Sequence, residues 1–249
     1  TMGEMNIAFY GEQRTPSRCG RLDQACAFGV MPVNMTFDGN EVFVDKIKVK
    51  KPLYWVFSEL NGSKDTVKIL SDLNKCYPFA ETEIEKNVQK ALGIENEKLI
   101  AKATKAIESG DAKQVGSLMV EAQNMFDSMV APASPKELAA PQLHKVLNDE
   151  NIKKYTYGAK GVGSQGDGSV QFLAKDEQSQ ADLIKYIKDE YGMEGFRLTL
   201  KPEKNILKIA RFVLLVTGIS FISYGAARGE AAVVLGKAIK LCLECVGIG

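Results

Sequence analysis

Hydrophobic and polar positions alternate with a period of two in the first quarter of the chain. The alternation over 32–37 and 41–50 predicts two half-buried strands, joined by an Asp-Gly-Asn turn at 38–40. An apolar and aromatic run over 53–60 predicts a third strand, which ends at an Asn-Gly pair. An opening helix that ends near Tyr10 is expected to precede these strands.

From residue 66 to 131 the apolar positions recur every three or four residues, as in amphipathic helices. Three apolar stripes follow one another, separated by breaks at 77–78 and 109–111. A further helix is predicted from Ser134, acting as N-cap, with Pro135 in its first turn, and it runs to Leu147. This part of the chain is expected to be entirely helical.

A strand at 169–173, an amphipathic helix at 176–191 and a strand at 196–200 complete the pattern. Strands and helices in this order predict an α+β fold, an α/β sandwich in which helices cover one face of a sheet.

A hydrophobic helix is predicted near the C-terminus, over 206–227. Its last sixteen residues carry no charge, which is near the lower limit for a membrane span, and Lys208, Arg211 and Arg228 flank them. The basic residues that precede the run favour a cytoplasmic N-terminal domain, anchored in the membrane by this single helix. A buried or interfacial helix is the alternative.

Composition narrows the class of protein. The chain is 45% hydrophobic and 25% charged, as in globular proteins, and its net charge of +1 provides no basis for nucleic-acid binding. Residues from 201 onward hold seven Lys or Arg against three Asp or Glu. This asymmetry predicts two modules, 1–200 and 201–249.

The cysteines form two groups, and no signal peptide opens the chain. Three are scattered without metal-ligand spacing and are predicted to be buried small residues: Cys19, Cys26 and Cys76. Cys242 and Cys245 form a Cys-x-x-Cys pair, suited to dithiol exchange or to half of a metal site. His144 is the single histidine, so it has no partner histidine for a metal site or a relay.

The segment 158–168 contains five glycines in eleven residues and leads directly into an apolar strand. Glycine adopts positive φ and leaves backbone amides uncovered, so such a loop can form an anion-binding nest. The segment lacks the Gly-Lys-Ser/Thr ending of a Walker A loop. The alternative is a flexible hairpin loop.

Two motifs resemble a known superfamily. The run from Gly161 to Gly168 (Gly-Val-Gly-Ser-Gln-Gly-Asp-Gly) resembles the third motif of the GHMP kinases, which include galactokinase, homoserine kinase, mevalonate kinase and phosphomevalonate kinase. Gly20 to Gln24 resembles the Gly-x-x-Asp-Gln element that carries the catalytic aspartate of that superfamily. The likeness extends through 36–39, 64–66 and 77–80, covers residues 1–200, and is greatest for sugar and sugar-acid kinases such as glucuronokinase. The tail resembles small bacterial membrane proteins that end in Cys-x-x-Cys.

The resemblance implies ATP-dependent phosphorylation of a hydroxyl on a sugar or sugar acid, with ATP and Mg²⁺ as cofactors. It implies catalytic roles for Asp23 and Arg21, and contacts to the substrate from Gly20 and Gln24. It also implies that one group of residues lines the phosphate or nucleotide site: Gly161, Gly163, Ser164, Gln165, Gly166, Asp167 and Gly168. No protein-bound metal is expected, with Cys242 and Cys245 as weak candidates.

One departure from the superfamily pattern qualifies this interpretation. The main nucleotide-binding loop should precede the aspartate motif, and the twenty-two residues before Asp23 do not form it. We therefore expect a truncated kinase, the C-terminal part of the fold without its nucleotide loop. Two alternatives remain: a non-catalytic, membrane-attached protein that retains half a kinase fold, or a thiol or metal module that acts through Cys242 and Cys245.

Overall fold

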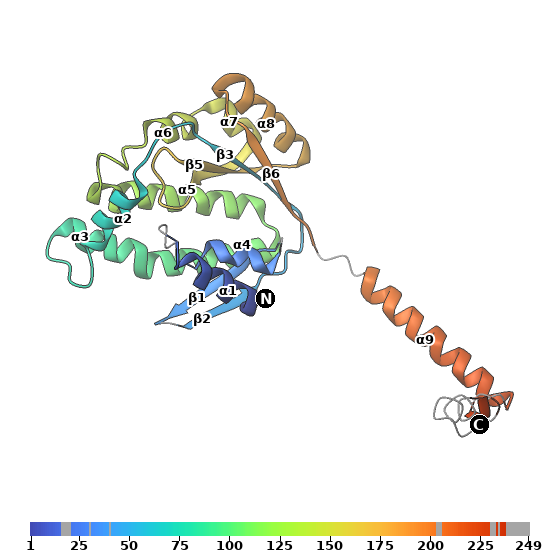
Figure 1. Ribbon diagram of the computed structural model, residues 1–249. Helices are drawn as coiled ribbons and strands as arrows, with labels where there is room; N and C mark the ends of the chain where they lie inside the picture. The colour runs from blue at the N-terminus through green and yellow to red at the C-terminus, as the bar shows by residue number, and fades with distance from the viewer. Residues whose placement is uncertain are drawn as a thin grey trace. The chain divides into compact units, whose positions relative to one another are not determined.

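The computed structural model describes residues 1–15, 21–29, 31–39, 41–202, 206–229, 233 and 235–237. The chain forms two compact units, Thr1–Pro202 and Glu203–Gly249, and each is described by itself (Figure 1).

The first unit is built on a four-stranded antiparallel sheet with the order β4-β5-β3-β6. The strands are β3 (Leu53–Glu59), β4 (Thr156–Gly161), β5 (Ser169–Ala174) and β6 (Gly195–Leu200). Central β3 pairs Val56 with Phe172 of β5, and Leu53 with Leu200 of β6. The predicted strands at 53–60, 169–173 and 196–200 are thus confirmed.

Helices cover both faces of this sheet (Figure 1). On one face α6 (Pro141–Leu147), α7 (Glu150–Tyr155) and α8 (Glu177–Tyr191) pack on Val56 and Phe172. On the other face α4 (Asn96–Ser109) and α5 (Ala112–Met129) pack on Leu53 and Leu173. The prediction of an α+β sandwich is confirmed, but the prediction that only one face is covered was wrong. The reason is that β3 and β5 carry apolar residues at successive positions, so both faces must be buried.

Apart from the 3₁₀ turn η3 (Ala131–Ala133), the remaining elements of this unit lie before α4. They are α1 (Met2–Glu12), the 3₁₀ helix η1 (Asp23–Phe28), β1 (Val33–Asp38), β2 (Glu41–Lys46), α2 (Thr66–Asn74), α3 (Glu83–Lys90) and the π-helical turn η2 (Ala91–Glu95). Strands β1 and β2 form a separate antiparallel pair. The second strand, predicted over 41–50, ends at Lys46, four residues before its predicted end.

The predicted helix from Ser134 does not begin there. A short 3₁₀ turn, η3 (Ala131–Ala133), precedes Ser134, and α6 begins only at Pro141. The Ser134 hydroxyl donates to Asp72 Oδ2 at 3.0 Å rather than to the backbone of a following helix turn. A contact between distant segments therefore replaces the local capping interaction that the sequence suggested.

Asp72 joins α2 to this turn, and its charge should make folding sensitive to acid. Hydrogen bonds from Lys68, Lys75 and Ser134 hold the pKa of its carboxyl well below the ordinary 3.8. Since the folded pKa is depressed, the stabilisation is present above the unfolded pKa and is lost as the pH falls towards the folded pKa. We expect Asp72→Asn to unfold more easily than the wild type at pH 7, and the difference to shrink below about pH 4.

Urea titrations from pH 7 to pH 2.5 measure this effect. Asp189→Asn, at an exposed position of α8, is the matched control. A stability difference between wild type and Asp72→Asn that stays constant down to pH 2.5 would contradict the assignment.

The second unit contains α9 (Ile206–Ala227), the predicted C-terminal hydrophobic helix. Over the described residues no helix has the length and apolar character that crossing a membrane requires, so the predicted span finds no support in the structure.

The cysteine predictions have different outcomes. Cys76 is buried as expected, whereas Cys26 is exposed, because it lies on the outer side of a short 3₁₀ helix. Cys19, Cys242 and Cys245 lie outside the described residues.

Candidate functional site: a glycine loop between two lysines

The glycine-rich segment is part strand and part loop. Gly158 and Gly161 belong to β4, an edge strand of the sheet, so the predicted loop over 158–168 began too early. The connection from β4 to β5 is residues 162–168, which we call the glycine loop. The strand was not predicted because its pairing with β5, rather than apolar alternation, holds it extended.

Most backbone amides of the glycine loop are uncommitted. Val162 N–H donates to Ser169 O, and Gln165 N–H donates to Val162 O. The other five amides have no hydrogen-bond partner among the described residues: Gly163, Ser164, Gly166, Asp167 and Gly168. Positive φ angles at Gly163 (63°), Gln165 (61°) and Gly166 (68°) turn the backbone within the loop. A turn of this kind with free amides can form a concave anion-binding nest.

One lysine contacts the glycine loop and another contacts the residue that precedes it. Lys64 Nζ donates to Gln165 O at 2.7 Å, and Lys160 Nζ donates to Gly161 O at 2.7 Å. Within the described residues neither lysine forms a salt bridge, and burial lowers the pKa of both ammonium groups. Two partly buried cations without carboxylate partners favour an anionic ligand.

A glycine makes the Lys64 contact possible. A Cβ on Gly168 would lie 2.6 Å from Lys64 Cε, so any larger residue would displace the lysine. Lys64 belongs to the segment 64–66 of the wider resemblance and was not predicted as a site residue. Since it lies 101 positions from Gln165, no local pattern could have linked the two.

Three of the residues predicted to bind phosphate are buried or already bonded within the protein. The Gly161 amide donates to Gln123 Oε1 at 2.8 Å. Asp167 Oδ1 accepts from the Leu143 amide in the first turn of α6 at 2.9 Å. The Gln165 side chain is turned inward, and the residue is only 5% exposed. The uncommitted groups of the loop are therefore five backbone amides, and of their residues Gly163 is exposed, Ser164, Asp167 and Gly168 are half-buried and Gly166 is buried.

The second predicted motif lies against α1. Asp23 is exposed at the start of η1, whereas Gln24 is 7% exposed. The Arg21 guanidinium lies 4.3 Å from the centre of the Phe9 ring and donates to Asn6 Oδ1 at 3.4 Å. Gly20 lies outside the described residues. These contacts of Arg21 are with α1, and those of the glycine loop are with Lys64, α5 and α6, so a joint site of the two motifs stays a prediction.

The described part of the chain holds no group of three or more His, Cys, Asp and Glu side chains placed to bind a metal ion. We therefore assign no metal ligand among these residues.

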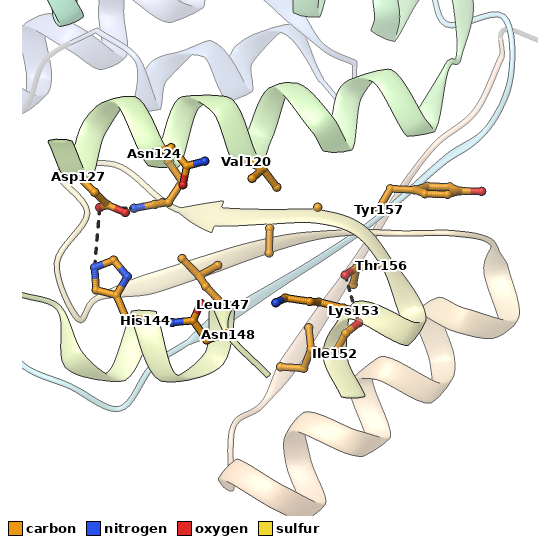
Figure 2. A pocket seen from close by; sticks show the side chains of 13 residues that line it. Val120, Asn124, Asp127, His144, Leu147, Asn148, Ile152, Lys153, Thr156 and Tyr157 are labelled. Carbon is orange, nitrogen blue, oxygen red and sulfur yellow. Dashed lines mark hydrogen bonds and ion pairs between the residues drawn. The ribbon is translucent and has the colours of Figure 1, made fainter. Parts of the chain in front are cut away.

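A cavity of about 400 Å³ lies between α5, α6, α7 and β4 (Figure 2). At one end Asp127 of α5 faces His144 of α6, with Oδ1 and Nε2 3.8 Å apart (Figure 2). Gly158 and Ala159 of β4 form part of its wall. The cavity therefore brings His144, which had no assigned role, next to elements that hold the loop.

No protein-family profile matches the sequence, and no curated protein matches it significantly. Solved structures do match. L. major mevalonate kinase in complex with R-mevalonate has a TM-score of 0.59 at 18% identity, over 80% of this chain and 58% of that chain. Streptococcus pneumoniae phosphomevalonate kinase in complex with phosphomevalonate and AMPPNP has 0.54 at 13%, over 78% and 60%. Homoserine kinase from Cytophaga hutchinsonii has 0.53 at 15%, over 80% and 56%.

This chain thus spans less than two thirds of the length of each of these kinases. The matches cover most of this chain and show the same fold in all three kinases. The protein has the fold of the GHMP kinases.

Proposed function

We propose that this chain takes part in ATP-dependent transfer of a phosphoryl group to a hydroxyl of a small molecule, a sugar or a sugar acid. The observation that carries the proposal is the glycine loop with its five uncommitted amides, together with two lysines that have no carboxylate partner, Lys64 bonded to Gln165 O in the loop and Lys160 to Gly161 O just before it. On a GHMP-kinase fold, such a loop is suited to bind phosphate oxygens.

In the proposed reaction, the acceptor oxygen forms a bond to the γ-phosphorus of ATP while the bond to the ADP oxygen breaks. The proton of the acceptor hydroxyl passes to the Asp23 carboxylate. Loop amides, Lys64 and Lys160 stabilise negative charge on the transferring group, which is where most of the catalysis of phosphoryl transfer arises. Arg21 supplies a further positive charge. Bound Mg²⁺ would be carried by the nucleotide rather than by residues of this chain, and would supply further positive charge to the phosphates.

The choice of a sugar or sugar acid rests on the sequence resemblance, whereas the matched structures are mevalonate, phosphomevalonate and homoserine kinases. ADP formation with a panel of hexoses, pentoses, uronic acids, mevalonate and homoserine separates these classes. We expect turnover with a sugar or uronic acid. Turnover only with mevalonate or homoserine would correct the substrate class, and no turnover together with no nucleotide binding would overturn the proposal.

Lys64→Met should weaken nucleotide binding without unfolding the chain. Methionine keeps the length of the buried stem but removes the charge, and a charge-assisted hydrogen bond contributes about 1.5–3 kcal/mol. We therefore expect the Kd of a fluorescent ATP analogue, measured by titration, to rise about tenfold or more. Lys185→Met, at an exposed position of α8, is the matched control. An unchanged Kd in Lys64→Met would remove Lys64 from the site.

A further inference from the structure

The buried side chain of Gln123 lines the cavity in Figure 2 and accepts a hydrogen bond from Gly161, the residue that precedes the glycine loop. It is 4% exposed and comes from the middle of α5. Its Oε1 accepts from the Gly161 amide at 2.8 Å, and its Nε2 donates to Asp127 Oδ1 at 2.8 Å. Both ends of one buried amide are therefore committed, one to the residue that precedes the loop and one to a carboxylate.

The carboxylate determines which way this amide points. An ionised carboxylate only accepts hydrogen bonds, so the NH₂ end of Gln123 must face Asp127. The carbonyl end is thereby directed at Gly161, whose N–H needs an acceptor because it points away from β5. Neighbouring Val162 N–H points the other way, to Ser169 across the sheet. Asp127 thus orients Gln123, and Gln123 orients the start of the loop.

The other end of the loop is bonded to α6, and α6 faces α5 through His144. Asp127 faces His144 of α6 at 3.8 Å, one residue after Leu143. The Leu143 amide in turn donates to Asp167 near the end of the glycine loop. Gly161 is therefore bonded to α5, and Asp167 is bonded to α6. The five uncommitted amides belong to residues 163–164 and 166–168.

We propose that Gln123, oriented by Asp127, is a positioning residue that sets the geometry of the glycine loop for phosphoryl transfer. The proposal rests on the proposed function, since it assumes that the loop holds phosphate. Gln123 itself need not touch ATP. Its effect is transmitted through one backbone hydrogen bond, and a displacement of about 1 Å at a reacting group is enough to lower the rate about a hundredfold.

Three variants on the full chain test this role. Gln123→Leu removes both hydrogen bonds at similar volume. Gln123→Glu keeps an acceptor for Gly161 but places a second carboxylate beside Asp127. Adding Asp127→Asn to Gln123→Glu supplies an NH₂ group to the new carboxylate. Both hydrogen bonds then return: the Gly161 amide again donates to residue 123, and residue 127 now donates to residue 123 instead of accepting from it. Gln114→Leu, at an exposed position of α5, is the matched control.

Two readouts are taken: hydrogen exchange of the Gly161 amide by NMR, and the steady-state constants for ATP-dependent phosphorylation. For Gln123→Leu and Gln123→Glu we expect exchange at Gly161 to accelerate at least about tenfold and kcat to fall about tenfold to a hundredfold, with KM for the acceptor changed less than about twofold. The Gln123→Glu/Asp127→Asn double variant should recover most of both losses, which a general loss of stability would not allow.

The outcomes separate the two proposals. Unchanged Gly161 exchange in folded Gln123→Leu, or a double variant no better than Gln123→Glu alone, would overturn the positioning role. If Gln123→Leu does not fold, the comparison of Gln123→Glu with the double variant decides. If the wild type shows no phosphoryl transfer, the proposed function and the catalytic meaning of this role fail together, while Gly161 exchange still decides whether Gln123 sets the geometry of the loop.

Discussion

Replacing Gly158 with alanine is expected to separate β4 from α5 and to destabilise the first unit by about 3 kcal/mol or more. A Cβ on Gly158 would lie 2.1 Å from Gly116 O, and a Cβ on Gly116 would lie 2.5 Å from the Tyr157 carbonyl carbon. Overpacking usually costs about 1–3 kcal/mol when side chains can move aside. Here the obstacle is backbone against backbone, so a whole strand or helix must shift.

Thermal and urea unfolding of Gly158→Ala measure this loss. For a domain of this size about 3 kcal/mol corresponds to a fall in Tm of roughly 6–12 °C. Gly11→Ala is the control, because a Cβ there meets nothing within 4 Å. Its stability should change by no more than about 1 kcal/mol, in the favourable direction. A Tm for Gly158→Ala within 2 °C of the wild type would show that β4 and α5 do not pack as described.

Asp23→Asn is expected to lower kcat for the proposed phosphoryl transfer by about 10²–10⁴. Asparagine keeps the size of the side chain but cannot take the proton of the acceptor hydroxyl. Asp23 is exposed at the start of η1, so its substitution should not disturb packing. The Tm and the Kd for nucleotide should therefore stay unchanged while the rate falls, which separates a chemical role from a structural one.

The matched control for this prediction is Asp189→Asn, which should retain the full rate. Stopped-flow or steady-state measurement of ADP formation with the substrate found in the panel provides the readout. A rate for Asp23→Asn within about threefold of the wild type would exclude Asp23 as general base, because even weak general-base catalysis contributes about a hundredfold. The fold assignment would be unaffected by that result.

Local sequence signals predicted most of the elements correctly. The three strands at β3, β5 and β6 and the helix α8 follow from hydrophobic period and capping, for example Asp176, whose side chain accepts from the Ser179 amide. The local predictions at β4 and at Ser134 were wrong. The β4 sequence has two glycines and no clear alternation, so only its partners reveal a strand. Ser134 had the signature of an N-cap, but Asp72 of α2 engages its hydroxyl.

The candidate site could be predicted only in part. The glycine pattern indicated a loop with free amides, since that property depends on the loop residues themselves. It could not show that the Gly161 amide and the Asp167 carboxylate are already engaged, because their partners Gln123 and Leu143 lie 38 and 24 positions away. Lys64 was missed for the same reason.

The sequence by itself determined the order of strands and helices, the glycine loop and the superfamily whose fold the chain adopts, because each depends on short-range pattern. Only the tertiary structure decided which groups of that loop are free to meet an anion and which serve to hold it. Hydrogen bonds and close approaches between distant segments make that distinction, and these depend on how the helices pack on the sheet rather than on any local run of residues.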